Sequence, residues 1–392
     1  MKEPVIVSAV RTPMGSFNGN LSSIPATRLG AIVVREALKR AGVQGSEVEE
    51  VIMGNILSAG LGQAPARQAA LYAGLPKTAG ALTINKVCGS GLKAVMLAAQ
   101  AVKAGDAQVV IAGGMESMSN APYLLMKARN GYRMGHGELI DSMIKDGLWD
   151  VYDDVHMGNA AELCAEKFHI SREEQDQFAI TSYQRALTAQ KKGHFKEEIV
   201  PVSVLQKGNE NLIKEDEAPG KVNFEKMRSI KPVFKDGGTV TAANASSLGD
   251  GAAALVVTDS ETAQKKGLKP LVKIVGYASS ATEPVWFTTA PVQTIERLLN
   301  KTGYRILDVD LFEINEAFSV SSIAVNRKLA LDPEKVNIWG GAVALGHPIG
   351  ASGSRILTTL IHALKALNKR LGVAAICLGG GEAVAMMVEN VD

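Results

Sequence analysis

Cysteines, long apolar runs and an excess of charge of either sign are all scarce in this sequence of 392 residues. The three cysteines are too few for a disulfide framework and too widely spaced for a zinc site, so we expect a reducing compartment. No run of about 18 apolar residues occurs, and the sequence therefore predicts no membrane span. The formal net charge of +2 gives no reason to expect a nucleic acid or an anionic membrane as a partner.

The two ends of the sequence match no targeting signal that we recognise. Residues 1–13 lack an uninterrupted apolar segment and reach Pro13 early, unlike a secretory signal peptide. Residues 386–392 match neither a retention nor a peroxisomal tripeptide. We therefore expect a cytoplasmic protein.

An internal repeat organises the chain, whose length alone predicts two or more domains. Matching segments keep their order and stand 260 to 266 positions apart: 35–43 with 296–304, 51–55 with 311–315, 88–91 with 350–353, and Gly113 with Gly379. Chance similarity would scatter these separations. A nearly constant separation indicates two copies of one domain.

Each copy has the pattern of an α/β unit. Residues 92–105 carry apolar side chains at helical spacing, and residues 108–114 form an apolar, β-branched segment typical of a buried strand. Residues 354–367 and 372–380 repeat this pattern in the second copy. Such units predict layered sheets covered by helices.

Residues 117–248 have no counterpart in the second copy and are rich in charged and turn-forming residues. We interpret them as an inserted loop domain that carries substrate and subunit contacts. The predicted division is residues 1–116 with about 249–268, the inserted loop domain 117–248, and residues 269–392.

Cys88 stands between an extended segment and a predicted helix, and is followed by Gly89, Ser90 and Gly91. The free N–H groups and positive end of a helix favour a thiolate, which is the nucleophilic form of cysteine. Glycines there also leave amide donors for an oxyanion. The alternative, a buried core cysteine, is equally compatible with the residues alone. Cys164, in a helical pattern, is interpreted as structural.

Three further residues are candidates for the same site. His347 precedes the helix of the second copy, and if the copies pack about a pseudo-twofold axis it faces Cys88 and can act as its base. Cys377 ends a strand before Gly379–Gly381, where a thiol can move protons and amides can bind a thioester oxygen. Asn315 follows an apolar strand and needs polar partners. The alternatives are a histidine that only hydrogen-bonds its turn and a cysteine that only fills the core.

Seven motifs together resemble the thiolase family over essentially the whole chain. They are VSAVRTPMGSF, NKVCGSGLKAV, AGGMESMSNAPY, TAANASSLGDGAAA, NEAF, GHPIGASG and CLGGGEAV, in the order that the family has them. The resemblance implies an α/β class protein with a duplicated, five-layered αβαβα thiolase fold and an inserted loop domain.

The resemblance also implies roles for the catalytic residues. Cys88 is the nucleophile that becomes acylated, and His347 activates it. Cys377 is the acid/base that removes the α-proton of the second acyl-CoA. Asn315 holds a water that forms one oxyanion hole with His347, and the backbone N–H groups of Cys88 and Gly379 form the other.

The same resemblance assigns the substrate contacts. Ser246 touches the pantetheine arm, His156 and Met157 lie beside the coenzyme and the acyl group, and Phe234 and Phe318 line the pantetheine tunnel. Coenzyme A is a substrate here, so no cofactor and no metal are expected.

Within the family, the sequence favours a short-chain acetyl-CoA C-acetyltransferase, which joins two acetyl-CoA into acetoacetyl-CoA and coenzyme A. Trp286 and Phe287 add bulk that suits a short acyl chain. Alternatives are a degradative 3-ketoacyl-CoA thiolase of broader chain length, a β-ketoacyl synthase, and a non-catalytic thiolase-like acyl-CoA binding protein. A homotetramer or homodimer is expected, with residues 120–143 a candidate tetramer contact.

Overall fold

The first half of the fold is built on a mixed β-sheet. The computed structural model describes residues 2–206 and 208–391. From its free edge inward the sheet has the order β4, β3, β5, β12, β1, with β4, β3 and β5 parallel and β12 antiparallel to both of its neighbours. The bounds are β1 (Pro4–Arg11), β3 (Glu50–Gly54), β4 (Gly80–Ile84), β5 (Val109–Ser117) and β12 (Gly249–Asp259).

The second half repeats this sheet. Its order is β14, β15, β16, β13, with β14 and β15 parallel and the other pairs antiparallel. A parallel bridge from Phe312 to Val336 takes the place that β4 has in the first sheet. The two sheets join where β1 pairs with β13 over two residues, so the hydrogen bonds form one continuous path. The bounds are β13 (Val272–Ala281), β14 (Leu311–Ile314), β15 (Leu371–Leu378) and β16 (Glu382–Asn390).

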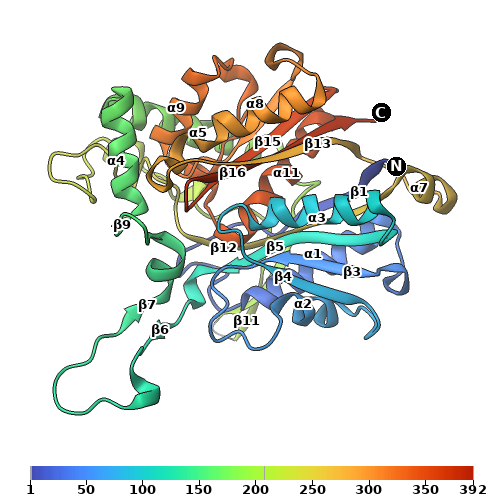
Figure 1. The fold of residues 1–392 in the computed structure, drawn as a ribbon, viewed down its shortest axis with the longest axis horizontal. Coiled ribbons are helices and arrows are strands. Elements are labelled where there is room, and N and C mark those ends of the chain that lie inside the picture. The colour runs from blue at the N-terminus through green and yellow to red at the C-terminus, as the bar shows by residue number, and fades with distance from the viewer. Residues whose placement is uncertain (1, 207, 392) are drawn as a thin grey trace.

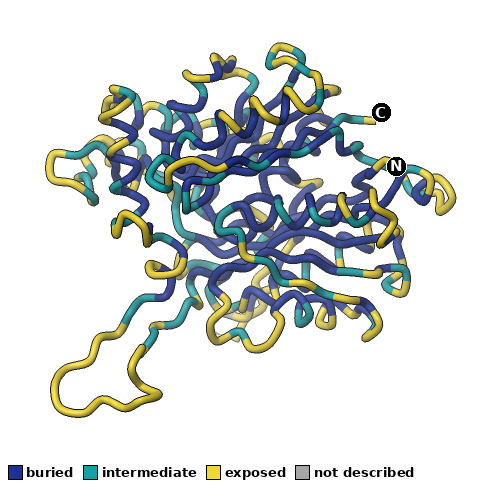
Figure 2. Tube along the Cα trace, viewed as in Figure 1, coloured by how far each residue is buried: buried dark blue, intermediate teal, exposed yellow. Residues whose placement is uncertain are grey.

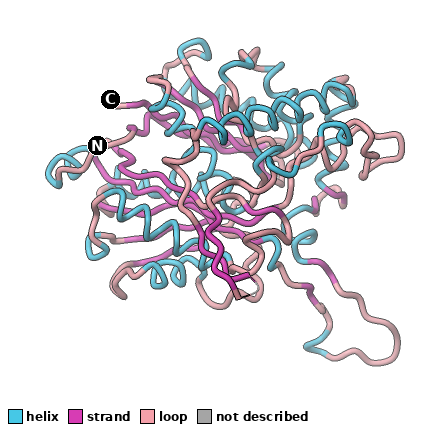
Figure 3. Tube along the Cα trace, turned by 180° about the vertical axis from the view of Figure 1, so that it is seen from behind, coloured by secondary structure: helices cyan, strands magenta, loops and turns pink. Residues whose placement is uncertain are grey.

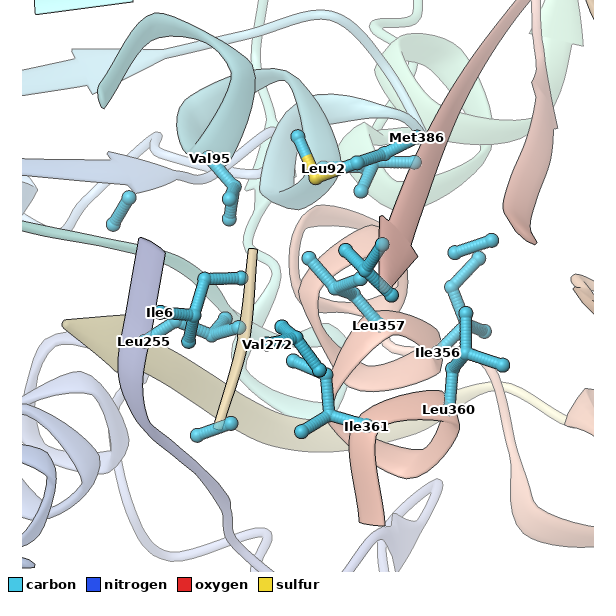
Figure 4. Packing of buried hydrophobic residues seen from close by; sticks show 14 of the residues in the cluster. Ile6, Leu92, Val95, Leu255, Val272, Ile356, Leu357, Leu360, Ile361 and Met386 are labelled. Carbon is cyan, nitrogen blue, oxygen red and sulfur yellow. The ribbon is translucent and has the colours of Figure 1, made fainter. Parts of the chain in front are cut away.

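Helices form three layers around and between the sheets (Figure 1). α3 (Ser90–Ala104) and α11 (Ile349–Ala366) share the central core with strands of both halves (Figure 4). α1 (Ala26–Ala41) and α2 (Pro65–Ala73) cover the outer face of the first sheet, and α8 (Ala290–Thr302) with α9 (Ser319–Lys328) cover that of the second. The order is therefore αβαβα, which confirms the predicted fold class.

The two central helices meet through glycines at equivalent points of the repeat. A Cβ atom on Gly91 of α3 would lie 2.7 Å from the Ser354 hydroxyl of α11, and one on Gly353 would lie 2.5 Å from the backbone nitrogen of Leu92. The contact is reciprocal, because residues 91 and 353, like 92 and 354, are 262 positions apart. The helices thus start side by side, as the pseudo-twofold packing predicted.

The segment between β5 and β12 forms most of the remaining elements. α4 (Met157–Phe168) shares a core with α9 residues beside the second sheet, while Arg11 of β1 binds Glu198 and Asp216 of the segment through buried ion pairs. The loop between β6 and β7 extends away from the body and is exposed along its length (Figures 1 and 2).

The view from behind shows the strands enclosed by helices (Figure 3). The remaining elements are mostly short strands and helices, apart from the long helix α5 (Arg172–Lys192). Among the described residues, no helix combines the length and apolar character needed to cross a membrane. The further elements are β2 (Gly15–Ser16), β6 (Tyr123–Leu124), β7 (Ile140–Asp141), β8 (Trp149–Asp150), β9 (Val155–His156), β10 (Val202–Gln206), β11 (Asn209–Ile213), α6 (Phe224–Met227), α7 (Ser260–Lys266) and α10 (Ala342–Leu345).

Candidate active site

Cys88 lies in a strained turn between β4 and α3. The preceding residue, Val87, has φ of 44°, a conformation that β-branched residues rarely adopt. The turn is held by Ser90, whose hydroxyl accepts from the Lys86 N–H at 2.8 Å and donates to the Val87 carbonyl at 2.6 Å. This geometry directs Cys88 into a cavity just before the first turn of α3.

The cavity environment keeps Cys88 protonated. Cys88 is half-buried, and desolvation of its sulfur in the cavity raises the pKa of the thiol to about 12, although the backbone N–H groups of Cys88 and Gly379 act on it in the opposite direction. The carboxyl group of Glu116 raises this pKa as well. The expectation that the helix end would favour a resting thiolate is therefore wrong, because desolvation of the charged sulfur outweighs the amide donors.

His347 is buried and its neutral tautomer is defined by its neighbour Ser352. The His347 Nδ1 atom lies 2.5 Å from the Ser352 hydroxyl oxygen. That hydroxyl donates its only proton to the Pro348 carbonyl at 2.9 Å, so it accepts from Nδ1–H. Nε2 is left unprotonated, with the Asn315 side-chain amide 3.5 Å away. Burial and the charge of Arg355 lower the pKa of His347 to about 3.

Cys377 is the penultimate residue of β15 and lies on the same cavity as Cys88. Burial raises the pKa of its thiol far above the ordinary value, and the nearby Cys88 raises it further. Gly380 and Gly381 follow with φ of 83° and 76°, and this glycine turn brings the Gly379 N–H to Cys88. Two neutral thiols and an unprotonated imidazole therefore share one enclosure.

The cavity has a volume of about 370 Å³ and a largely apolar lining. Nine of the ten sequence-predicted site residues lie on its wall, and the tenth, Asn315, contacts the wall residue His347. The nine wall residues are Cys88, His156, Met157, Phe234, Ser246, Phe318, His347, Cys377 and Gly379.

Aromatic rings form one side of the cavity. The His156 ring stacks on Phe234 at 4.8 Å between centroids, and Phe318 meets Phe234 and Phe287 edge-on at 6.5 and 6.4 Å. Of the two residues expected to restrict the acyl chain, only Phe287 lines the cavity. Trp286 instead packs under the Lys167 ammonium group at 4.0 Å.

Two polar residues of the site were missed by the sequence analysis. Ser352 orients His347 and lies within the same GHPIGASG motif, so its spacing of five residues was the available signal. Glu116 accepts hydrogen bonds from the Asn55 amide and from the N–H groups of Ile56, Leu57 and Gly350. These hydrogen bonds connect the first half of the fold to the start of α11. No local sequence pattern predicted this contact.

A duplicated α/β fold that brings two cysteines and a histidine into one apolar cavity defines a class of protein suited to thioester chemistry. Comparison with known proteins narrows that class. The thiolase N-terminal domain matches residues 4–261, and the thiolase C-terminal domain matches residues 268–390. The chain belongs to the thiolase family.

Individual relatives match along most or all of their length. An acetyl-CoA acetyltransferase of Schizosaccharomyces pombe is 53% identical over 391 residues, which are 99% of each chain. The mitochondrial acetyl-CoA acetyltransferase A of Xenopus laevis is 52% identical over 392 residues, covering all of this chain and 92% of the relative. The crystal structure of Acat5 thiolase from Ascaris suum in complex with coenzyme A superposes with a TM-score of 0.95, 46% identity and full coverage of both chains.

Proposed function

We propose that this thiolase is an acetyl-CoA C-acetyltransferase that forms and cleaves acetoacetyl-CoA. The observation that carries the proposal is the convergence of Cys88, Cys377 and the unprotonated Nε2 of His347 on one apolar cavity. Full-length relatives named acetyl-CoA acetyltransferases at above 50% identity support the acetyl group as the unit transferred.

In the first half-reaction, the Cys88 sulfur attacks the thioester carbon of acetyl-CoA. The thiol proton passes to His347 Nε2 as the new carbon–sulfur bond forms. The bond from the acetyl group to coenzyme A breaks, and the proton returns to the departing sulfur, so that free coenzyme A leaves as a thiol. Transfer during attack suits this site, because the raised pKa of Cys88 and the lowered pKa of His347 disfavour a resting ion pair.

In the second half-reaction, His347 Nε2 takes the thiol proton of Cys377, and the resulting thiolate removes a proton from the methyl group of a second acetyl-CoA. The resulting carbon nucleophile attacks the carbonyl carbon of acetyl-Cys88 and forms the new carbon–carbon bond. The bond to the Cys88 sulfur then breaks, the proton held by His347 restores the Cys88 thiol, and the α-proton stays on Cys377 as its thiol proton. A thiolate with a raised pKa is a stronger base, which suits removal of a weakly acidic proton.

Negative charge that develops on the two thioester oxygens needs donors. The N–H groups of Cys88 and Gly379 already act on the Cys88 sulfur, so an acetyl oxygen beside that sulfur comes within their reach. Asn315, through a water, and His347 would serve the oxygen of the second substrate. Ser246, His156, Met157, Phe234 and Phe318 would bind the pantetheine arm and the acyl group as cavity-wall residues.

Two alternatives make different demands on the cavity. A degradative thiolase of broad chain length needs room beyond the acetyl group, and the bulky ring of Phe287 lines the cavity. A non-catalytic acyl-CoA binding protein would bind substrate without forming an acyl-enzyme.

The assembly and organisation of the chain are part of the proposal. We infer a homodimer or homotetramer, because β4 ends the sheet with Leu82 exposed and the loop beyond β6 exposes Met126, Met134 and Leu139. The inserted loop domain 117–248 and the two thiolase halves remain the proposed division. The predicted compartment is the cytoplasm, although the relative from Xenopus laevis is named as mitochondrial.

Acetylation of Cys88 tests the proposed function. The protein is mixed with acetyl-CoA, quenched in acid and digested, and the acetyl group is located by mass spectrometry. We expect it on Cys88 in the wild type and nowhere in Cys88→Ala. An unmodified wild-type protein that still binds acetyl-CoA would support the non-catalytic alternative.

A further inference from the structure

Arg355 on α11 and Glu313 on β14 form a buried contact near His347. The Arg355 Nη1 and Glu313 Oε2 atoms lie 3.6 Å apart, and the two side chains are 1% and 2% exposed. Neither residue belongs to the cavity wall, and the mechanism above uses neither of them. A buried pair of this kind is weak evidence for stability alone, because apolar residues of similar size often serve as well.

The pair has a regular relation to the catalytic residues. Glu313 and Asn315 are two residues apart where β14 ends, so an extended backbone directs both to the same face. Ser352 and Arg355 are three residues apart on α11 and share one face of that helix. The contact between Glu313 and Arg355 therefore runs beside the chain Asn315–His347–Ser352 and connects the same two elements.

The polar groups of this pair are not satisfied by protein atoms. Within the described residues, both carboxyl oxygens of Glu313 and all three guanidinium nitrogens of Arg355 lack a hydrogen-bond partner. Buried polar groups normally have partners, and a polar contact slightly beyond hydrogen-bond length suits a bridging water. The pair can thus hold α11 and β14 together at a set distance without closing to direct hydrogen bonds.

We propose that Arg355, held by Glu313, is a positioning residue for the proposed thiolase reaction. It sets the placement of His347 against Asn315 and presents a positive charge beside the His347 ring. This inference rests on the proposed function, in which His347 Nε2 receives the proton of Cys88.

The charges around His347 support this role. Besides burial, Arg355 is the charged group that lowers the pKa of His347. The other titratable groups that act on Arg355 are Arg11, Glu198 and Glu316. Cys88 and Cys377 line the same cavity as His347 and are neutral at rest. Burial raises the pKa of Glu313 to about 8, so its negative charge is easily lost. Burial also lowers the pKa of Arg355, but a guanidinium titrates so far above neutral pH that it stays protonated.

The pH profile of coenzyme A-dependent thiolysis tests the proposal. The double variant Glu313→Leu/Arg355→Met removes the Arg355 charge together with the Glu313 carboxyl group, so no unpaired carboxyl group stays buried. We expect kcat to fall about tenfold with little change in KM, and the acid limb of kcat/KM to move up by about one pH unit or more. Arg355→Lys keeps the charge and should retain the wild-type limb. A folded double variant with the wild-type limb and wild-type kcat would overturn the proposal.

Two controls separate this role from a loss of structure. Arg172→Met removes another guanidinium, which binds Asp176 on α5, and should lower the melting temperature without moving the limb. Should the double variant not fold, Arg355→Gln is measured in its place with the same expected shift.

The tautomer of His347 in the unmodified enzyme provides an independent test of the role proposed for Arg355. In NMR spectra of histidine-labelled protein, assigned with His347→Asn, we expect a neutral Nδ1–H ring from pH 5 to 8. Protonation of that ring near pH 6.5 would overturn the proposal. The reading does not depend on catalysis, so inactivity of the wild type toward acetoacetyl-CoA would reject the proposed function alone.

Discussion

The hydroxyl of Ser352 lies 2.5 Å from Nδ1 of His347 and determines which ring nitrogen carries the proton. Because Ser352 donates to the Pro348 carbonyl, its oxygen can only accept from His347. The ring nitrogen that faces Asn315 and the cavity is consequently the free base. Ser352 on α11 therefore leaves Nε2 of His347, which precedes that helix, free to accept a proton.

Removing the Ser352 hydroxyl should slow the reaction without weakening substrate binding. In Ser352→Ala, His347 can adopt either tautomer, so we expect kcat for thiolysis to fall at least about tenfold while KM changes little. Steady-state kinetics with acetoacetyl-CoA and coenzyme A provide the measurement. Ser354→Ala is the matched control, since Ser354 donates only to the Ala351 carbonyl of its own helix. Equal losses in both variants would mean that Ser352 supports only the helix.

The raised pKa of Cys88 predicts how the free enzyme reacts with alkylating agents. With a pKa of about 12, the thiolate fraction, and with it the rate of modification by iodoacetamide, should rise about tenfold for each pH unit between 7 and 10. Peptide mapping follows Cys88, the cysteine that is partly exposed, while Cys164 and Cys377 are buried. A rate that reaches its plateau below pH 8 would show that the amide donors prevail over desolvation after all.

Cys377 should be needed for only one of the two half-reactions. In Cys377→Ala we expect normal acetylation of Cys88 by acetyl-CoA, but no exchange of the acetyl protons with deuterium oxide and no condensation. Proton NMR of acetyl-CoA incubated with the variant measures the exchange. If Cys377→Ala condensed acetyl-CoA at the wild-type rate, another group would have to remove the α-proton.

Phe287 should limit the length of the acyl chain. It lines the cavity and packs edge-on against Phe318, so Phe287→Ala opens space beyond the acetyl position. We expect kcat/KM for an eight-carbon 3-ketoacyl-CoA to rise about tenfold relative to acetoacetyl-CoA. Trp286→Ala controls for general loosening, because Trp286 packs against Lys167 and does not line the cavity. An unchanged ratio in Phe287→Ala would place the limit elsewhere.

The close contact of the two central helices should tolerate no side chain at Gly353. Its added Cβ would meet the Leu92 backbone nitrogen at 2.5 Å, which only a shift of α3 or α11 can relieve. Gly353→Ala should therefore lower the free energy of unfolding by about 1–3 kcal/mol in guanidinium titrations. Gly220→Ala, where a Cβ would meet nothing within 4 Å, should change it by less than about 0.5 kcal/mol. Comparable losses at both positions would remove the packing argument.

Much of this architecture was predictable because the internal repeat shows which segments, far apart in the sequence, occupy equivalent places in the fold. The nearly constant separation of the two copies predicted two equivalent helices side by side, and Gly91 packs against Ser354 as Gly353 packs against Leu92. The resemblance to thiolases selected nine residues that line the cavity and Asn315, which contacts His347.

What could not be predicted depends on burial and on side-chain direction. The position of Cys88 at a helix end suggested a thiolate, but the cost of desolvation depends on the walls that other segments supply. Trp286 and Phe287 are neighbours, and only coordinates reveal that their rings point to different surroundings. Glu116 and Arg355 act across elements that are far apart in the sequence, so no local pattern marks them.

The most direct test of the central claim is coenzyme A-dependent loss of acetoacetyl-CoA absorbance, run beside an eight-carbon 3-ketoacyl-CoA at equal concentration. Rapid loss of the four-carbon substrate and little loss of the longer one is the result that a short-chain acetyl-CoA C-acetyltransferase predicts. Comparable rates on both substrates would contradict it in favour of a degradative thiolase of broad chain length. No loss of either would contradict catalysis itself.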